Sequence, residues 1–463
     1  MKTITRKSTG HYQMDMTTGA ILPKMLAFSL PLMLSSILQL MFNAADIIVV
    51  GQFCGDASLA AVSSNGSLVN LLTGLFMGLS VGSNVLAARF FGSKSDEELS
   101  QTVHTSILIS IIAGVFLTFV GLIGARQLLI WMQTPDNVLE LASVYLRIYF
   151  VGMTSTTVYN FGAALLRAIG DTKRPLYYLI IAGVLNVVLN LFFVIVFHMD
   201  VAGVALATII SQTLSALLVV RCLLRESGGI RLDPKKLCIN KAKLIQIVRV
   251  GVPAGLQGTL FSLSNVVIQS SINLFGDIVV AGNGAAANLE GFVYVAMNAF
   301  YQATLSFTSQ NLGQHKYKRI IRTMLVGQAC VFVTGLVLGN LLYLAGDKLL
   351  WIYSDTQQVV EAGMLRLGFV ATTYFLCGMM DVMMGGLRGI GYSFLPMIVS
   401  LIGACGLRLV WIATIFQVPE FHIIETIYIS YPISWLVTFL VHLTCYIILT
   451  RRLRKRLGDE IAD

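Results

Sequence analysis

Asp46 is a carboxylate in the middle of an apolar stretch, residues 38–50. A charged carboxylate inside a bilayer is costly, so an acid in such a stretch marks an ion or substrate path by default. The alternative is a structural carboxylate that hydroxyl groups of a neighbouring helix hold in place. We predict the functional role, in which Asp46 binds and releases a proton or a metal cation.

Two amides and a hydroxyl are candidates to complete this site. Asn186 and Asn190 are spaced i, i+4 and share one helix face, and Thr208 lies in the next predicted helix. Together with Asp46 they supply oxygen ligands suited to a hard cation such as sodium. The same groups can hydrogen-bond a protonated carboxyl. Asparagines in membrane helices more often serve as contacts between helices. The prediction of an ion site therefore depends on their combination with Asp46.

Three further polar residues are candidates for a substrate or secondary ion site. Asp381 lies in Cys377–Met384 and Glu290 in Ala287–Phe292, both apolar surroundings. Asn160 stands in the first half of the chain at the place that Asp381 occupies in the second. Either acid could attract a cationic substrate or carry a second coupling ion, and a structural role is an equal alternative for each.

No motif indicates catalysis. The run Gly78–Gly82 fits the pattern G-x-S-x-G, but that motif requires a strand, a sharp turn and a helix, whereas this run lies within an apolar helix. Gly74, Gly78 and Gly82 instead recur every four residues, a spacing that lets two membrane helices approach closely. HExxH, P-loop and GxGxxG motifs are absent from the sequence, which indicates neither an enzyme nor an ATP-driven pump.

Composition identifies the class of protein that must position these residues. Of the 463 residues, 56% are hydrophobic and 12% are charged, whereas about 25% are charged in soluble domains. Apolar runs of about 20 residues recur, and each is long enough to cross a bilayer. The fold class is therefore an all-α polytopic membrane protein. Seven scattered cysteines indicate no disulfide framework, and no cleaved signal peptide is evident.

Twelve membrane helices are predicted. Their approximate ranges are 25–53, 58–90, 102–125, 138–161, 176–197, 201–224, 246–275, 280–310, 320–345, 360–384, 394–416 and 427–450. The predicted organisation is a tail (1–24), an amino lobe of six helices (25–224), a polar linker (225–245), a carboxy lobe of six helices (246–450) and a basic tail (451–463). The two tails and every second loop hold 27 of the 32 Lys and Arg residues. Because basic loops stay in the cytoplasm, we predict that both termini are cytoplasmic. The positive charge thus reflects topology and not nucleic-acid binding.

The two halves are related by an internal duplication. The motif Leu166–Gly170 returns 221 residues later as Leu387–Gly391, and each copy is followed by a proline at the same distance. A fixed long period is the mark of a repeat. Because each half has an even number of spans, the repeats are parallel, as in transporters whose sites lie in or between two such halves.

The chain resembles the MATE family, the multidrug and toxic-compound extrusion transporters, over almost its whole length. The resemblance rests on Pro31, Asp46, the run Val50-Gly51-Gln52, the run Gln310-Asn311-Leu312-Gly313 and both copies of Leu-Arg-x-Ile-Gly. It implies a V-shaped bundle of two lobes around a central cavity, alternating access, and export of organic cations in exchange for protons or sodium ions.

The resemblance also implies roles for individual residues. Asp46, Asn186, Asn190 and Thr208 match the amino-lobe cation site of DinF-like members, and Pro31 matches a proline implicated in bending the first helix. Asp381 matches a carboxy-lobe acid of NorM-like members. Two departures stand out: many members carry a second carboxylate where this chain has Asn190, and the NorM glutamate of the seventh helix has no counterpart in residues 256–265.

The sequence thus predicts a multi-pass antiporter of the cell membrane, active as a monomer, that exports cationic or amphipathic drugs. Asp46 is the main coupling residue and a possible sodium site, and neither another metal nor a cofactor is expected. The first alternative is a flippase for lipids or lipid-linked oligosaccharides, which the small number of embedded basic residues (Arg147, Arg366, Arg408) disfavours. The second is a membrane-embedded enzyme or receptor, which the lack of catalytic motifs and of a sizeable soluble domain disfavours.

Overall fold

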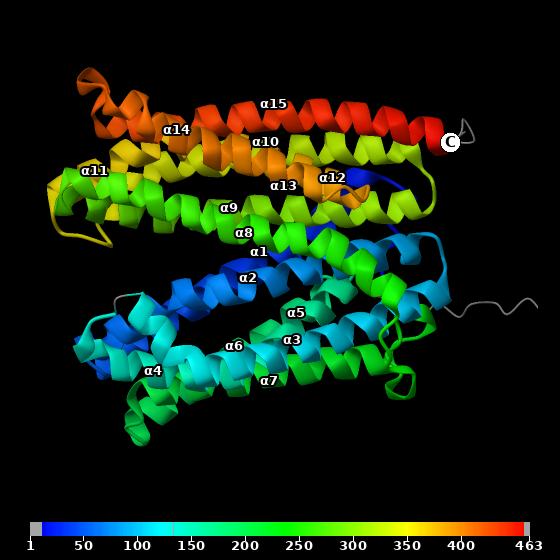
Figure 1. Cartoon of the computed structure of the whole chain (residues 1–463), viewed down its shortest axis with the longest axis horizontal. Helices are drawn as coiled ribbons and strands as arrows, with labels where there is room; N and C mark the ends of the chain where they lie inside the picture. Colours follow the sequence, from blue (N-terminus) through cyan, green and yellow to red (C-terminus); the bar gives the residue numbers. More distant parts are fainter. Residues whose placement is uncertain (1–11, 133, 458–463) are drawn as a thin grey trace, which may run out of the picture. The chain divides into compact units, whose positions relative to one another are not determined.

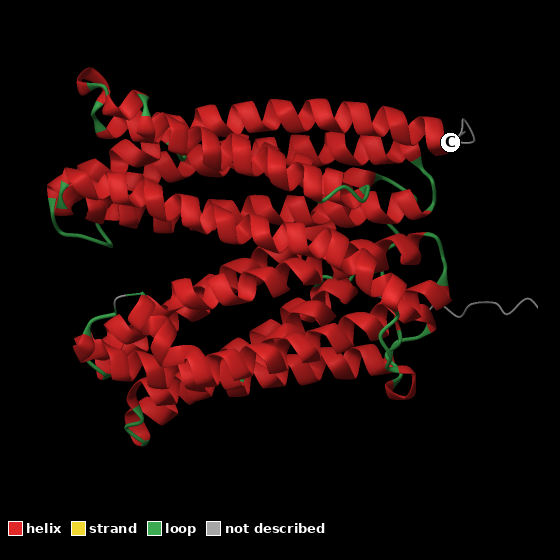
Figure 2. Cartoon of the chain, viewed as in Figure 1, coloured by secondary structure: helices red, strands yellow, loops and turns green. Residues whose placement is uncertain are grey.

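The computed structural model describes residues 12–132 and 134–457, and its regular elements there are all helices (Figures 1 and 2). The α-helices of the first half are α1 (Ile21–Phe53), α2 (Asp56–Gly92), α3 (Asp96–Trp131), α4 (Asp136–Val151), α5 (Met153–Ala168), α6 (Lys173–Leu191) and α7 (Asp200–Arg225). Those of the second half are α8 (Lys241–Ile272), α9 (Asp277–Gly313), α10 (Tyr317–Leu350), α11 (Gln357–Phe369), α12 (Phe375–Gly389), α13 (Phe394–Ser400), α14 (Leu407–Ala413) and α15 (Ile424–Leu457). Two π-helical segments, η1 (Phe192–Val196) and η5 (Leu401–Gly406), continue α6 and α13.

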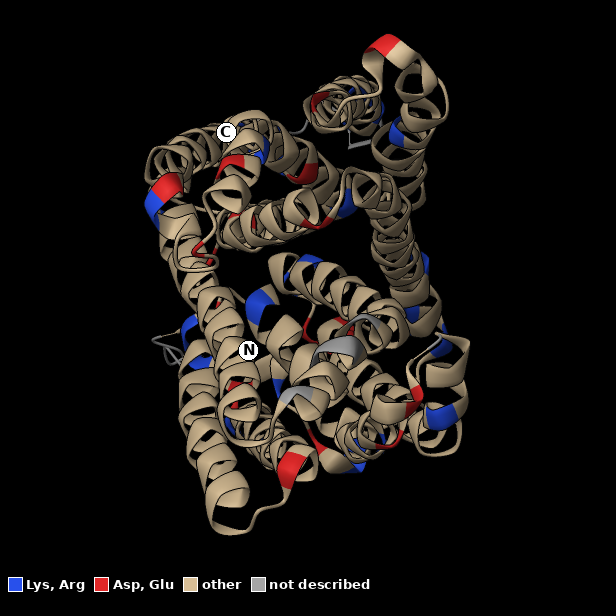
Figure 3. Ribbon diagram, turned by 90° about the vertical axis from the view of Figure 1, so that its left-hand side faces the viewer, with Lys and Arg blue, Asp and Glu red and all other residues tan. Residues whose placement is uncertain are grey.

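The helices confirm the polytopic membrane fold. In the described part of the chain, ten helices are long and apolar enough to cross a bilayer, and the bent pair of α4 and α5 brings the number to eleven if it is counted as one span. The remaining predicted span, 360–384, corresponds to α11 and α12, which are 13 and 15 residues long. Most of the ribbon is neither acidic nor basic (Figure 3).

Two predicted spans are broken where continuous helices were expected. The span predicted at 138–161 is α4 and α5, which meet at Gly152 with a bend of 49°. The span predicted at 360–384 is α11 and α12, separated by residues 370–374. There the hydroxyls of Thr372 and Thr373 donate to the carbonyls four residues earlier, over 2.6 Å in each case. Such back-bonding often bends a helix.

The backbone confirms the internal duplication. Gly170 and Gly391, which end the two copies of the repeated motif, have φ angles of 87° and 97°. Lys94 and His315, also 221 residues apart, both have a φ of 57°. A positive φ is uncommon for residues other than glycine, so its recurrence at the same offset shows that the two halves make the same turns.

The described chain forms two compact units, and their boundaries fall inside helices. Unit 1 contains residues up to Met16 and Leu34–Gly255, and unit 2 contains Thr17–Met33 and Leu256 onward. Each of the helices α1 and α8 therefore contributes to both units, whereas the predicted lobes divide at the linker 225–245. Residues 1–11 of the predicted amino-terminal tail and 458–463 of the carboxyl tail lie outside the description.

Small residues pack α2 against the first half of α8 in unit 1. A Cβ on Gly78 would lie 2.1 Å from the backbone nitrogen of Gly255, and one on Gly82 would lie 2.3 Å from the Ile247 carbonyl. A Cβ on Gly255 would lie 2.6 Å from the Cα of Leu75. The close helix contact predicted from the glycine spacing is confirmed.

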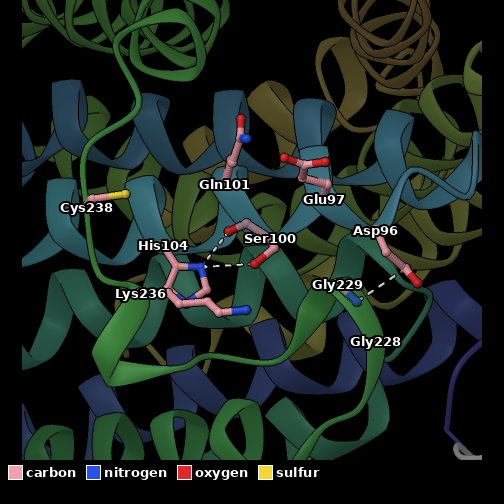
Figure 4. A pocket seen from close by; sticks show the side chains of 9 residues that line it. All are labelled: Asp96, Glu97, Ser100, Gln101, His104, Gly228, Gly229, Lys236 and Cys238. Atoms are coloured by element: carbon pink, nitrogen blue, oxygen red, sulfur yellow. Dashed lines mark hydrogen bonds between the residues drawn. The ribbon is translucent and has the colours of Figure 1, made fainter.

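The linker between the halves is bound to the start of α3, and together they line an open polar pocket of about 520 Å³ (Figure 4). The backbone N–H of Asp233 donates to His104 Nε2 over 3.0 Å, while His104 Nδ1 lies 2.6 Å from the Ser100 carbonyl. Lys243, at the start of α8, forms an ion pair with Glu98 of α3. These contacts make the linker a fixed part of unit 1.

Candidate ion-coupling site

The four residues predicted to form the coupling site lie on three helices of unit 1. Asp46 is half-buried on α1, Asn186 and Asn190 are buried on α6, and Thr208 is half-buried on α7. Glycine permits the close approach of α1 to α6, because a Cβ on Gly183 would lie 1.8 Å from the ring of Phe42. The i, i+4 spacing of the two asparagines aims both amides at the same neighbours.

Hydrogen bonds connect the four side chains. The Asn190 amide donates to the Asp46 carboxylate and also lies 3.3 Å from Asn186 Oδ1. The Asn186 amide donates to the Thr208 hydroxyl over 3.4 Å. That hydroxyl can turn its own proton toward the Val204 carbonyl, 2.9 Å away, or toward the Asp46 carboxylate. The residues that the sequence singled out therefore form one continuous network.

Two features of this network bear on its chemistry. Among the described residues, neither a lysine nor an arginine forms an ion pair with Asp46. Asn190 Oδ1 is fully buried and has no hydrogen-bond partner among the residues that the structure describes. An ionised carboxylate is costly to bury without a counter-charge, and the open amide oxygen can accept from a protonated carboxyl or ligate a cation. The network can therefore hold either a proton or a sodium ion.

Two tyrosines that the sequence did not single out lie in the same part of unit 1 as Asp46, in the apolar cluster that contains Val49 and Val50 of α1. Tyr145 and Tyr149 of α4 stack with their ring centroids 5.9 Å apart, and both interact electrostatically with the Asp46 carboxylate. Their i, i+4 spacing on α4 was the available signal. Tyrosines are common in membrane helices, so the spacing alone did not distinguish them.

Glu290, one of the candidate secondary acids, is neutralised within unit 2. Arg366 donates to both of its carboxylate oxygens, over 3.0 Å from Nε and 2.7 Å from Nη2. Arg366 also donates to Asn283 Oδ1 over 2.7 Å. Glu290 and Arg366 are both buried. This geometry is a bidentate buried ion pair, the arrangement expected of a structural arginine and its partner.

Asp381 and Asn160, the other candidates, lie in different units and different surroundings. Asp381 is buried in unit 2, where it lies near the Tyr294 hydroxyl and is attracted by Arg388. Asn160 lies on α5 in unit 1, where its amide donates to the Thr156 carbonyl over 2.7 Å. Asn160 therefore makes a local helix contact, whereas Asp381 belongs to a network of tyrosine and arginine.

The two prolines at matching places in the repeats lie near the unit boundaries. Pro31 lies inside α1 and Pro253 inside α8. Each stands two residues before its helix passes from one unit to the other. A proline inside a helix removes one backbone hydrogen bond and favours a kink, so both positions suit a hinge.

Comparison with known proteins identifies the family and the fold. A family model described as MatE matches residues 31–192 and 253–414, one match in each repeat. The chain is 27% identical to the probable multidrug resistance protein YoeA of Bacillus subtilis (strain 168), over 89% of this chain and 91% of that protein. It is 28% identical to the probable multidrug resistance protein YpnP of the same organism, over 85% of this chain and 88% of that protein. A solved structure described as the outward-facing conformation of a multidrug resistance MATE family transporter superposes with a TM-score of 0.90 at 22% identity, over 97% of this chain and all of that one.

Proposed function

This chain belongs to the MatE family of membrane transporters, and on that premise we propose that it is a secondary antiporter that exports cationic or amphipathic organic compounds. The relatives described as multidrug resistance proteins support this class of substrate. The driving ion is a proton or a sodium ion that binds at Asp46.

The observation that carries the proposal is the Asp46 network. Asp46 has amide and hydroxyl partners but, among the described residues, is in no ion pair with a basic side chain. Its charge is therefore best neutralised by a mobile cation. Ion binding converts the site from charged to neutral, and this change can favour a different arrangement of α1, α6 and α7. An ion drives transport only through its different affinities for the two states.

Glu290 has no place in this mechanism, because Arg366 already neutralises it. Asp381 is the better candidate for attracting the cationic group of a substrate, since among the described residues it forms no direct ion pair, unlike Glu290, and it lies near the aromatic ring of Tyr294. Coupling is thus assigned to unit 1 and substrate charge recognition to unit 2.

The test uses purified protein in liposomes and a fluorescent organic cation. An inward proton gradient and an inward sodium gradient are imposed separately, and dye export is recorded for each. We expect one of the two gradients to drive export and the other to have no effect. If neither gradient moves any cation of a panel while the vesicles scramble labelled lipid, the flippase alternative replaces this proposal.

A further inference from the structure

Arg408 is a buried cation that the coupling mechanism does not use. It lies on α14, directly after the π-helical segment η5, and its side chain is 4% exposed. Its Nε donates to the Ser434 hydroxyl over 2.7 Å, but its Nη2 has no hydrogen-bond acceptor among the residues described. A π-helical turn rotates the residues that follow it, and such turns are frequent at functional sites.

In the described part of unit 2, neither an aspartate nor a glutamate forms an ion pair with Arg408. Arg366 pairs directly with Glu290, and Arg388 interacts electrostatically with Asp381. The titratable groups that interact most with Arg408 are, in contrast, hydroxyls and thiols: Tyr431, Cys377, Cys405 and Tyr374. Burying a guanidinium without a carboxylate partner is costly. An anion from outside the chain would remove that cost.

Aromatic rings lead from the surface of unit 2 to Arg408. Tyr294 is 38% exposed, and its ring centroid lies 6.4 Å from that of Tyr374. Tyr374 lies 5.4 Å from Trp435, and the Arg408 guanidinium lies 5.4 Å from Trp435 and 4.3 Å from Tyr431. We call these four rings the aromatic ladder. Cation–π contacts offset part of the cost of burying Arg408 but supply no hydrogen-bond acceptor for Nη2.

The ladder has opposite charges at its two ends. Asp381 lies near the hydroxyl of Tyr294 at the exposed end, while Arg408 stands over Tyr431 and Trp435 at the buried end. A flat aromatic ligand can stack on the rings between them. A carboxylate on such a ligand matches the planar donor fork of an arginine.

We propose that Arg408 and the aromatic ladder form a binding site for the carboxylate of planar aromatic zwitterions, whose cationic group lies toward Asp381. The inference rests on the proposed export function and narrows its substrates. Arg408 then acts as a specificity residue that favours zwitterions over the corresponding simple cations.

The experiment measures binding of two dyes that differ only in the carboxylate. Rhodamine 110 carries a free carboxylate beside its cationic ring system, and rhodamine 123 is its methyl ester. Dissociation constants are measured by fluorescence anisotropy with purified full-length protein in detergent, without an ion gradient. We expect rhodamine 110 to bind about tenfold more tightly than rhodamine 123, as one charged hydrogen-bonded contact allows.

Variants of Arg408 test whether this residue causes the preference for rhodamine 110. Arg408→Gln should abolish the preference for rhodamine 110 over rhodamine 123, and Arg408→Lys should retain part of it. Arg147→Gln, which removes an exposed arginine of unit 1, is the matched control and should keep the full preference. If Arg408→Gln does not fold, competition on the wild type decides instead: benzoate should displace rhodamine 110 more effectively than benzamide does.

The outcomes separate this inference from the export function. Equal affinities for the two dyes in the wild type, a preference that survives in Arg408→Gln, or no dye binding would overturn the site. Displacement of rhodamine 110 by chloride as effectively as by benzoate would assign Arg408 to inorganic anions and would also contradict the proposal. If an ion gradient drives export of rhodamine 123 but the protein binds rhodamine 110 no more tightly than rhodamine 123, the antiporter proposal stands and the Arg408 site is refuted. If the protein prefers rhodamine 110 but neither gradient drives export, the Arg408 site stands and the antiporter proposal is refuted.

Discussion

The Asn190 amide donates to the Asp46 carboxylate, while the amide oxygen of the same residue stays buried without a partner among the described residues. This relationship stabilises the ion-free form of Asp46, because a donated hydrogen bond favours the charged carboxylate. It also leaves an acceptor for the ion-bound form.

Replacing Asn190 should therefore change ion affinity in a defined direction. Asn190→Asp removes the donor but keeps an acceptor oxygen, so the charged form of Asp46 loses a contact of about 1.5–3 kcal/mol and faces a like charge, while the ion-bound form keeps its partner. The ion should then bind at least about tenfold more tightly and leave more slowly. Transport rates measured against ion concentration should show half-saturation at a lower concentration and a lower maximum. An unchanged half-saturation concentration would remove Asn190 from the site.

The buried pair of Arg366 and Glu290 should stabilise unit 2 without taking part in coupling. Removing one partner of a buried ion pair costs about 3–5 kcal/mol, whereas replacing both with apolar residues of similar volume costs less. Glu290→Gln should lower the unfolding midpoint in detergent more than Glu290→Leu combined with Arg366→Met does. The Glu290→Gln protein that remains folded should still transport substrate in response to the same ion gradient as the wild type. Loss of coupled transport at unchanged stability would instead assign Glu290 to transport.

Close packing of α2 on α8 predicts a contrast between two glycines of the same helix. Gly255→Ala places a methyl group against the backbone of Leu75 and should destabilise the protein by about 1–3 kcal/mol. A methyl group on Gly258 would meet no atom within 4 Å, so Gly258→Ala should be neutral or stabilising, as alanine favours a helix. Thermal unfolding of both variants in detergent checks the difference. Equal midpoints would show that the helices move apart easily.

The two helix prolines should affect transport more than stability. Pro253→Ala and Pro31→Ala each restore a backbone hydrogen-bond donor within α8 or α1 and make the helix straighter. We expect each to lower the maximal transport rate several-fold, with the unfolding midpoint unchanged or raised. Wild-type rates in both variants would rule out a hinge at these positions.

Membrane orientation can be tested at Cys238, which is exposed in the linker. If the termini and the linker are cytoplasmic, a membrane-impermeant maleimide should label Cys238 in inside-out vesicles but not in intact cells. Cys238→Ser identifies the labelled site. Labelling from the outside of intact cells would invert the predicted topology.

Much of this architecture is readable from the sequence because it depends on local patterns. The repeated motif predicts the equivalent turns at Gly170 and Gly391, and the spacing of Gly78 and Gly82 predicts a close helix contact. The connection of Asp46 with Asn190 was also predicted, although the two residues are 144 positions apart, because buried polar groups in membrane helices must find partners.

Other features depend on tertiary contacts that no local pattern encodes. Gly152 and Thr372 are tolerated inside ordinary helices, so the breaks there were not predicted. The division of α1 and α8 between two units depends on contacts between residues far apart in the sequence. Tyr145 was missed for the same reason, since its place in one apolar cluster with Val49 of α1 depends on tertiary packing.

The central claim is that Asp46 couples ion binding to export, and the most direct measurement compares two kinds of flux in Asp46→Asn. The variant mimics the neutral, ion-bound site, so it should still exchange labelled substrate for unlabelled substrate across liposomes without a gradient. It should no longer accumulate substrate when an ion gradient is imposed. Asp136→Asn, which removes an exposed acid at the start of α4, should behave as the wild type in both assays. Gradient-driven accumulation at the wild-type level in Asp46→Asn would contradict the account.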